Sequence, residues 1–287
     1  MNDQNFEDYL GIQHRRIVHK KFFGIDYSGG WEAGKKIWIC EADYLQDSLY
    51  IKSIYSIFNK FGLKSRIESN SKIIEIIEKN EDTVFGFDFP FSLPNQALQD
   101  LNWKDFIINF KANFSDEHDF RSKMRNLFKG KDIKRICDIQ GKTPFSPYNL
   151  RIYKQTFFGI SEILKPLLLL NNSTILPFDT PKEGKSSIME VCPASLLKIR
   201  KNEIKWPRAY KGNKDIHRKN RYEILEFVEN CLSIRYSDQS FKRLILDDPE
   251  GDALDSLLCV ICSLRGLSYP ELSIKNEFYT KEGFVYC

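Results

Sequence analysis

The sequence predicts an α/β fold, because short apolar segments of strand character alternate with longer stretches of helical pattern. Three of the apolar segments share one form. Each carries a single acidic residue near its end and then stops at glycines or at a proline, and they span 21–31, 83–90 and 187–193. At 287 residues the chain is long enough to bury a large core, as one domain or as two.

The composition is that of an ordinary globular protein, with 42% hydrophobic and 29% charged residues, and this excludes a disordered chain. A net charge of +4 permits a polyanionic partner without requiring one. The most apolar stretch, 163–170, is interrupted by Lys165 and Pro166 and is too short to cross a bilayer, so we expect a soluble protein without a membrane partner.

The seven cysteines are scattered through apolar segments. The first nine residues are acidic and polar, unlike a signal peptide, so we expect reduced thiols in a cytoplasmic protein. Cys259 and Cys262 have a C-x-x-C spacing, but no second pair and no histidine lies near them in the sequence. We interpret both as core residues.

In the first third of the chain, a polar arm over 1–20 precedes the first strand. A second strand over 36–42 follows a glycine-bearing turn, which is typical of a hairpin. Segment 49–55 fits either a third strand or the beginning of a helix. Ser71 is a suitable N-cap for a helix over 71–79, and Pro90 ends the strand 83–90.

The remaining segments are mostly helical by pattern. Helices are predicted over 103–114, 117–128 and 149–170, and the segment 194–246 is both helical and basic. The last apolar helix, 256–264, follows an acidic stretch that contains Asp252 and Asp255. Because these two residues are three positions apart, they share one face near the beginning of that helix.

Five carboxylates therefore lie where a charge is costly unless it is paired: Asp26, Asp88, Glu190, Asp252 and Asp255. A divalent cation would remove their mutual repulsion, and Mg²⁺ and Mn²⁺ prefer such oxygen ligands. Two ions about 3.5–4 Å apart can activate a water and stabilise the leaving oxygen when a phosphodiester is hydrolysed. The alternative is that these acids are helix caps and arginine partners, above all Asp252.

Four motifs, in their order along the chain, resemble those of domain-of-unknown-function family 429: Gly-Ile-Asp-Tyr-Ser-Gly-Gly-Trp, Phe-Asp-Phe-Pro-Phe-Ser-Leu-Pro, Met-Glu-Val-Cys-Pro-Ala-Ser and Asp-Ala-Leu-Asp-Ser-Leu. That family is regarded as a set of predicted nucleases with an RNase H-like fold. The resemblance runs from Gly24 to Leu264, and the last motif also resembles the final acidic helix of Holliday-junction resolvases.

The resemblance implies an RNase H-like mixed central sheet with flanking helices. This domain would span 21–270, with mainly helical insertions at about 92–185 and 194–246, between the arm 1–20 and a C-terminal tail, 271–287. It further implies the roles of the acids. Asp26, Asp88, Asp252 and Asp255 would bind Mg²⁺ or Mn²⁺, and Asp26, Asp88 and Asp255 would carry catalysis with Glu190, which could be a ligand, a base or a structural residue.

Basic residues in two places could contact phosphates of a nucleic acid. Arg151 and Lys154 begin the long helix after a proline-bounded entry, and the run 211–221 contains His217, Arg218 and Arg221. Both groups could equally form a solvated surface.

The leading hypothesis is a nuclease that hydrolyses DNA or RNA through a carboxylate-bound two-metal site. One alternative is a phosphotransferase or ATPase of the actin-like and sugar-kinase type. Such enzymes need two halves with glycine-rich phosphate loops, whereas this chain has one Ser-Gly-Gly. Another is a non-catalytic nucleic-acid-binding module on the same fold, which the presence of every expected acid disfavours. ATP-induced stabilisation would support the first alternative, and metal binding without turnover the second.

Overall fold

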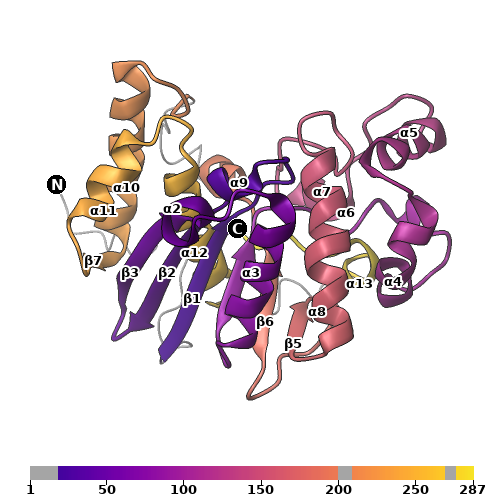
Figure 1. Ribbon diagram of the computed structural model, residues 1–287, viewed down its shortest axis with the longest axis horizontal. Coiled ribbons are helices and arrows are strands. Elements are labelled where there is room, and N and C mark those ends of the chain that lie inside the picture. The colour runs from indigo at the N-terminus through magenta and orange to yellow at the C-terminus, as the bar shows by residue number, and fades with distance from the viewer. Residues whose placement is uncertain (1–18, 200–208, 269–275) are drawn as a thin grey trace.

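The computed structural model describes residues 19–199, 209–268 and 276–287, so the expected arm over 1–20 lies almost wholly outside the described residues. Figure 1 shows a central sheet flanked by helices. The sheet has seven strands in the order β5-β6-β4-β1-β2-β3-β7. The predicted α/β class and the mixed central sheet are confirmed.

Three consecutive strands form an antiparallel meander: β1 (His19–Asp26), β2 (Trp38–Leu45) and β3 (Ser48–Ser56). The hairpin is thereby confirmed. Segment 49–55, for which the sequence allowed either a strand or a helix, is part of β3. On the other side of β1 the sheet is parallel, through β4 (Val84–Phe87), β6 (Ser186–Glu190) and β5 (Ser173–Leu176). β7 (Ser233–Tyr236) runs parallel to β3 at the opposite edge.

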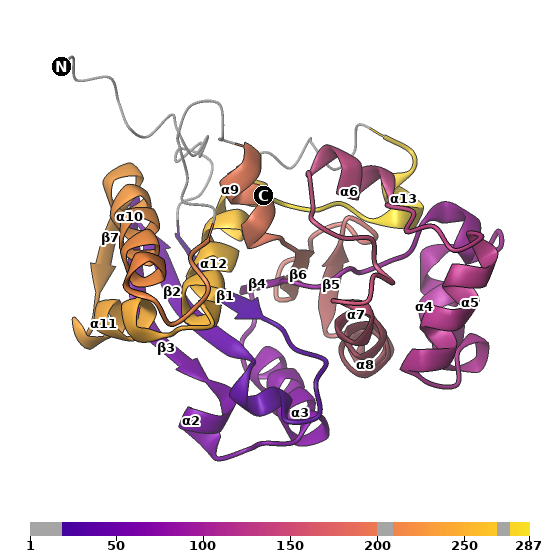
Figure 2. The same ribbon diagram turned by 90° about the horizontal axis from the view of Figure 1, so that it is seen from above.

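Helices cover both faces of the sheet because side chains alternate along each strand. Figure 2 shows α12 and α3 on opposite sides. Phe22 of β1 packs with one layer and Phe23 with the other. The first layer contains α9 (Pro193–Ile199), α10 (Asp215–Cys231), α11 (Ser240–Asp247) and α12 (Asp252–Ser268). The second contains α2 (Ile57–Phe61), α3 (Arg66–Glu78), α4 (Trp103–Asn113), α5 (Glu117–Leu127), α7 (Tyr153–Gly159) and α8 (Lys165–Leu170).

Some predicted boundaries are wrong. Helix α3 begins five residues before Ser71, because Ser65 is the N-cap and its hydroxyl accepts a hydrogen bond from the N–H of Glu68. Helices α7 and α8 are joined by a π-helical turn, Ile160–Leu164, so the helix predicted over 149–170 is one nearly continuous rod, but it begins at Tyr153. Pro166 has no N–H to donate, and it lies directly after this turn.

Both segments predicted to be helical insertions also contribute a strand to the central sheet. These strands, β5 and β7, have four residues each and form its two edges. Strands this short are difficult to recognise from an alternating pattern. The end of the chain includes the short helix α13 (Tyr279–Glu282), and Tyr286 then donates its N–H to the carbonyl of Glu190 at 2.9 Å. The last described residues thus extend the sheet beyond β6.

Helix α12 lies directly on the backbone of two adjacent strands. Gly24 of β1 and Gly86 of β4 are paired in register. A Cβ atom at Gly24 would lie 2.1 Å from the carbonyl oxygen of Ser256, and one at Gly86 would lie 2.1 Å from the hydroxyl of Ser263. Only glycine therefore permits this approach, which brings the first turn of α12 to the end of β1.

Cys259 and Cys262 are buried and unpaired on α12, which confirms their core role. Among the described helices, none has the combination of length and apolar character that a membrane span requires.

Candidate metal centre

Strand alternation places two of the predicted acids on the face covered by α12. Asp26 ends β1 two residues after Gly24, and Asp88 follows β4 two residues after Gly86. The N–H of Asp88 donates to the carbonyl of Ile25 at 3.0 Å, which continues the β1–β4 pairing by one residue. Both carboxylates therefore project toward the beginning of α12.

Asp248, rather than Asp252, caps the beginning of α12. Its carboxylate accepts hydrogen bonds from the N–H groups of Ala253 at 2.8 Å and Glu250 at 3.1 Å. Asp252 and Asp255 are thus not needed as caps, and both face the cavity. This removes the alternative in which Asp252 has only a capping role.

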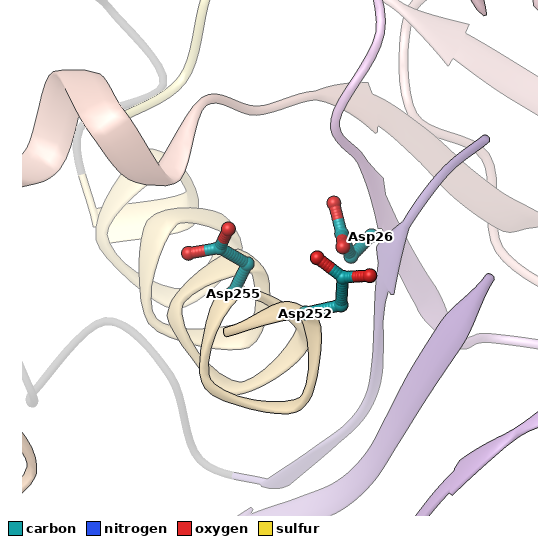
Figure 3. A group of neighbouring side chains, drawn as sticks. All are labelled: Asp26, Asp252 and Asp255. Carbon is teal, nitrogen blue, oxygen red and sulfur yellow. The ribbon is translucent and has the colours of Figure 1, made fainter. Parts of the chain in front are cut away.

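Three carboxylates from two distant parts of the chain meet at this point. Figure 3 shows Asp26 at the end of β1 and Asp252 and Asp255 on the first turn of α12. One oxygen of each lies within 4.8 Å of the others. As whole residues, Asp26, Asp252 and Asp255 are 8%, 9% and 4% exposed, respectively. The Asp26 carboxylate forms no hydrogen bond or ion pair with any residue that the structure describes.

Burial and mutual repulsion make the charged state of this cluster costly. Desolvation, and then the neighbouring Asp252, hold the pKa of Asp26 well above its ordinary value. Burial, and then Asp255, raise the pKa of Asp88 to about 7. Burial also raises the pKa of Asp252 to about 6, although Lys211 opposes the shift. A bound cation would favour the ionised forms of all three.

Two residues that were not predicted to contact the acids complete the cluster, and one of them begins the basic run 211–221. The Lys211 ammonium lies 2.7 Å from Asp255 Oδ2 and 3.3 Å from Asp252 Oδ1. The Tyr210 hydroxyl donates to Asp255 Oδ1 at 2.7 Å. Asp255 thus has a partner on each oxygen, unlike Asp26.

Glu190 does not join these acids. Its place on β6 is opposite Phe87, one residue beyond Gly86, so it belongs to the other face of the sheet. Arg135 binds both of its carboxylate oxygens, with Nη1 at 2.9 Å from Oε2, and Phe91 N–H donates to Oε2 at 2.9 Å. The guanidinium of Arg135 also donates two hydrogen bonds to Asp138, and the whole group is buried. These contacts favour the structural alternative for Glu190.

The predicted phosphate contacts are engaged elsewhere and do not line the cavity. The Lys154 ammonium lies 3.6 Å from Glu117, and the Arg151 guanidinium lies 5.4 Å from the ring centre of Phe145, a residue of the cavity wall. The Arg218 guanidinium lies 2.9 Å from Asp247.

The other two predicted contacts, His217 and Arg221, hold the backbone before α10 and near the end of α11. His217 Nδ1 accepts the N–H of Lys214 at the beginning of that helix. Arg221 is buried and donates to the carbonyls of Leu246, Tyr210 and Gly212.

The acids line one side of a cavity of about 570 Å³. Phe89, Pro90, Pro144 and Phe145 form apolar parts of its wall. The described lining contains two lysines, Lys36 and Lys211, against seven acidic residues, which are Asp26, Asp88, Asp138, Glu190, Glu250, Asp252 and Asp255. Because negative charge dominates, the cavity requires additional cations before it can accept an anionic group.

Comparisons with family models, curated proteins and solved structures found no match to this chain.

Proposed function

We propose that this protein is a metal-dependent hydrolase of phosphodiester bonds in DNA or RNA, in which Asp26, Asp252 and Asp255 bind Mg²⁺ or Mn²⁺. The observation that carries the proposal is the Asp26 carboxylate, which is 8% exposed and without a partner among the described residues, beside two further acids. A buried charge in that position is costly unless a cation binds it.

The donor set fits a hard divalent cation. All of the candidate ligand atoms are carboxylate oxygens, and no histidine or cysteine belongs to the group. Such a set favours Mg²⁺ or Mn²⁺ over zinc and copper. The ion, when bound, would polarise a phosphoryl oxygen and lower the pKa of a bound water.

The order of strands and motifs also supports this proposal. Three antiparallel strands followed by parallel ones, with the acids at the ends of β1 and β4 and on the first turn of α12, are compatible with the RNase H-like fold that the resemblance implies. Membership of family 429 belongs to the same proposal, because three of the four motifs that carry the resemblance contribute the acids Asp26, Asp88, Asp252 and Asp255.

The chain's own residues would orient a substrate and exclude water. Gln155 donates its side-chain amide to the carbonyl of Asp88, which fixes the loop after β4 against α7. The ring of Phe89 packs on Gly159, where a Cβ atom would lie 2.5 Å from its ring carbons. These contacts hold Asp88 at the cavity and keep one wall apolar.

The test is cleavage of labelled DNA and RNA of several forms in Mg²⁺ or Mn²⁺. Wild type is expected to cleave at least one substrate, and both chelator and the Asp26→Asn substitution should abolish cleavage. Lys36→Met is the matched control, because Lys36 lines the same cavity but pairs with Glu250 at 3.1 Å. Equal cleavage by wild type and Asp26→Asn would contradict the proposal. Metal binding without turnover would favour the non-catalytic module instead.

A further inference from the structure

Lys211 is partly exposed and contacts buried acids. Its side chain is 49% exposed, yet its ammonium contacts the two acids of α12, and the side chains of those acids are 12% and 5% exposed. It covers Asp252 and Asp255 from the cavity side and forms an ion pair with both. It therefore supplies a positive charge at the place where the cluster would otherwise bind a cation.

The backbone around Lys211 is held in position from two sides. From α10, Arg221 Nη1 donates to the carbonyls of Tyr210 at 2.6 Å and Gly212 at 3.3 Å. From the loop before α12, the carbonyl of Pro249 accepts the N–H of Gly212 at 2.6 Å.

Glycine is required where this segment meets the beginning of α12. Gly251 has a φ of 75°, and a Cβ atom there would lie 3.0 Å from the Tyr210 ring and 3.2 Å from Lys211 Cγ. The fold thus fixes the origin of the Lys211 side chain beside the acids.

The four carboxylates consequently differ in their partners. Asp252 and Asp255 share Lys211, whereas the carboxylates of Asp26 and Asp88 form no hydrogen bond or ion pair with any described residue. A two-ion site places its ions about 3.5–4 Å apart on shared carboxylates. Here the ammonium already lies where a second ion on Asp252 and Asp255 would have to bind.

We propose that Lys211 holds one of the two cation positions of the cluster, so that the protein binds a single divalent ion, with Asp26 as its principal ligand. This inference rests on the proposed metal-dependent function. It replaces the two-ion site expected from the sequence by one ion and one ammonium. In the reaction, the Lys211 ammonium would supply a positive charge that stabilises the phosphoryl group as negative charge develops on its oxygens.

The number of bound ions tests this role directly. Calorimetric titration of the full chain with Mn²⁺ should give one ion for wild type and two for Lys211→Met, which removes the charge and opens the position on Asp252 and Asp255. Lys36→Met removes a charge from the same cavity without touching the cluster and should give one ion. Lys211→Arg retains the charge and should also give one.

The outcomes separate the two proposals. Two ions on wild type, or one ion on a folded Lys211→Met protein, would overturn the role of Lys211 while leaving the metal site intact. No Mn²⁺ on any of these proteins would remove the metal site and the proposed function with it. If Lys211→Met does not fold, the counts for wild type and Lys211→Arg decide, because two ions on either contradict the proposal.

Discussion

Replacing Asp88 by asparagine should stabilise the metal-free protein at alkaline pH. The substitution keeps the size of the side chain and removes one charge from a cluster in which burial and Asp255 raise the pKa of Asp88 to about 7, from an ordinary value of 3.8. The Asp88 carboxylate has no partner among the described residues, so its ionised form is held in the folded state at a cost.

The magnitude follows from the two pKa values. One pKa unit corresponds to about 1.4 kcal/mol, so complete ionisation of Asp88 would lower the free energy of unfolding by about 4 kcal/mol. Because water in the cavity and Lys211 screen the charge, we expect about 1–4 kcal/mol. For a chain of this size, each kcal/mol corresponds to about 2 °C in the unfolding midpoint.

The sign of the pH dependence is opposite to that of a salt-bridged aspartate. In the pH range between the two pKa values, the folded state binds more protons than the unfolded state, so the stability of wild type falls as pH rises from about 4 to about 7. The asparagine side chain of the variant does not titrate. The stabilisation by Asp88→Asn should therefore be complete at about pH 8 and less than half as large at about pH 5.

The assay is thermal unfolding in chelator, followed by circular dichroism at these two pH values. Asp82→Asn, on an exposed turn, is a control for the loss of one negative charge elsewhere. An Asp88→Asn protein that is less stable than wild type at the higher pH, or equally shifted at both, would disprove this explanation. Lower stability of the variant at the higher pH would mean that Asp88 is ionised in the folded state with a favourable partner, and an equal shift at both pH values would mean that the effect does not come from its titration.

Three further substitutions test the packing around the cluster. Glu190→Ala leaves the buried guanidinium of Arg135 without one of its two carboxylates. The free energy of unfolding in a urea titration should fall by about 3–5 kcal/mol. An unchanged midpoint would exclude a structural role for Glu190. Gly24→Ala places a Cβ atom 2.1 Å from a carbonyl oxygen of α12. It should lower the free energy of unfolding by about 1–3 kcal/mol and also weaken Mn²⁺ binding. Normal Mn²⁺ binding would show that the site does not require the close approach of α12. Arg221→Met removes hydrogen bonds to the segment that carries Lys211 and should lower the unfolding midpoint by several degrees. A midpoint equal to that of wild type would contradict the anchoring of this segment by Arg221.

The sequence predicted the acids of the cluster because the signal is local. Asp26 and Asp88 each end an apolar strand, and Asp252 and Asp255 lie one helical turn apart, so the residue types and spacings point to strand ends and one helix face. The adjacent positions of β1 and β4 cannot be derived from the two segments, since the pairing of distant strands is not encoded in either strand alone.

The positions of Glu190 and Lys211 relative to the cluster could not be predicted in this way. Glu190 has the same sequence context as Asp26 and Asp88, but the face on which a strand residue lies depends on register. Because Glu190 pairs with Phe87 and not with the residue next to it, its side chain lies on the face of the sheet away from the cluster. Lys211 belongs to the basic run 211–221, and nothing in the sequence of that run indicates a contact with buried residues. Its role arises only when the segment after α9 folds against the beginning of α12, and a contact of that kind cannot be read from spacing.

Both proposals depend on a divalent cation at the carboxylate of Asp26, which has no partner among the described residues. An anomalous diffraction map from crystals of the protein grown in Mn²⁺ would locate such an ion. We expect one strong peak, at about 2 Å from a carboxylate oxygen of Asp26, with the Lys211 ammonium still on Asp252 and Asp255. A map without a peak in this cluster at saturating Mn²⁺ would contradict the metal site and the function proposed for it.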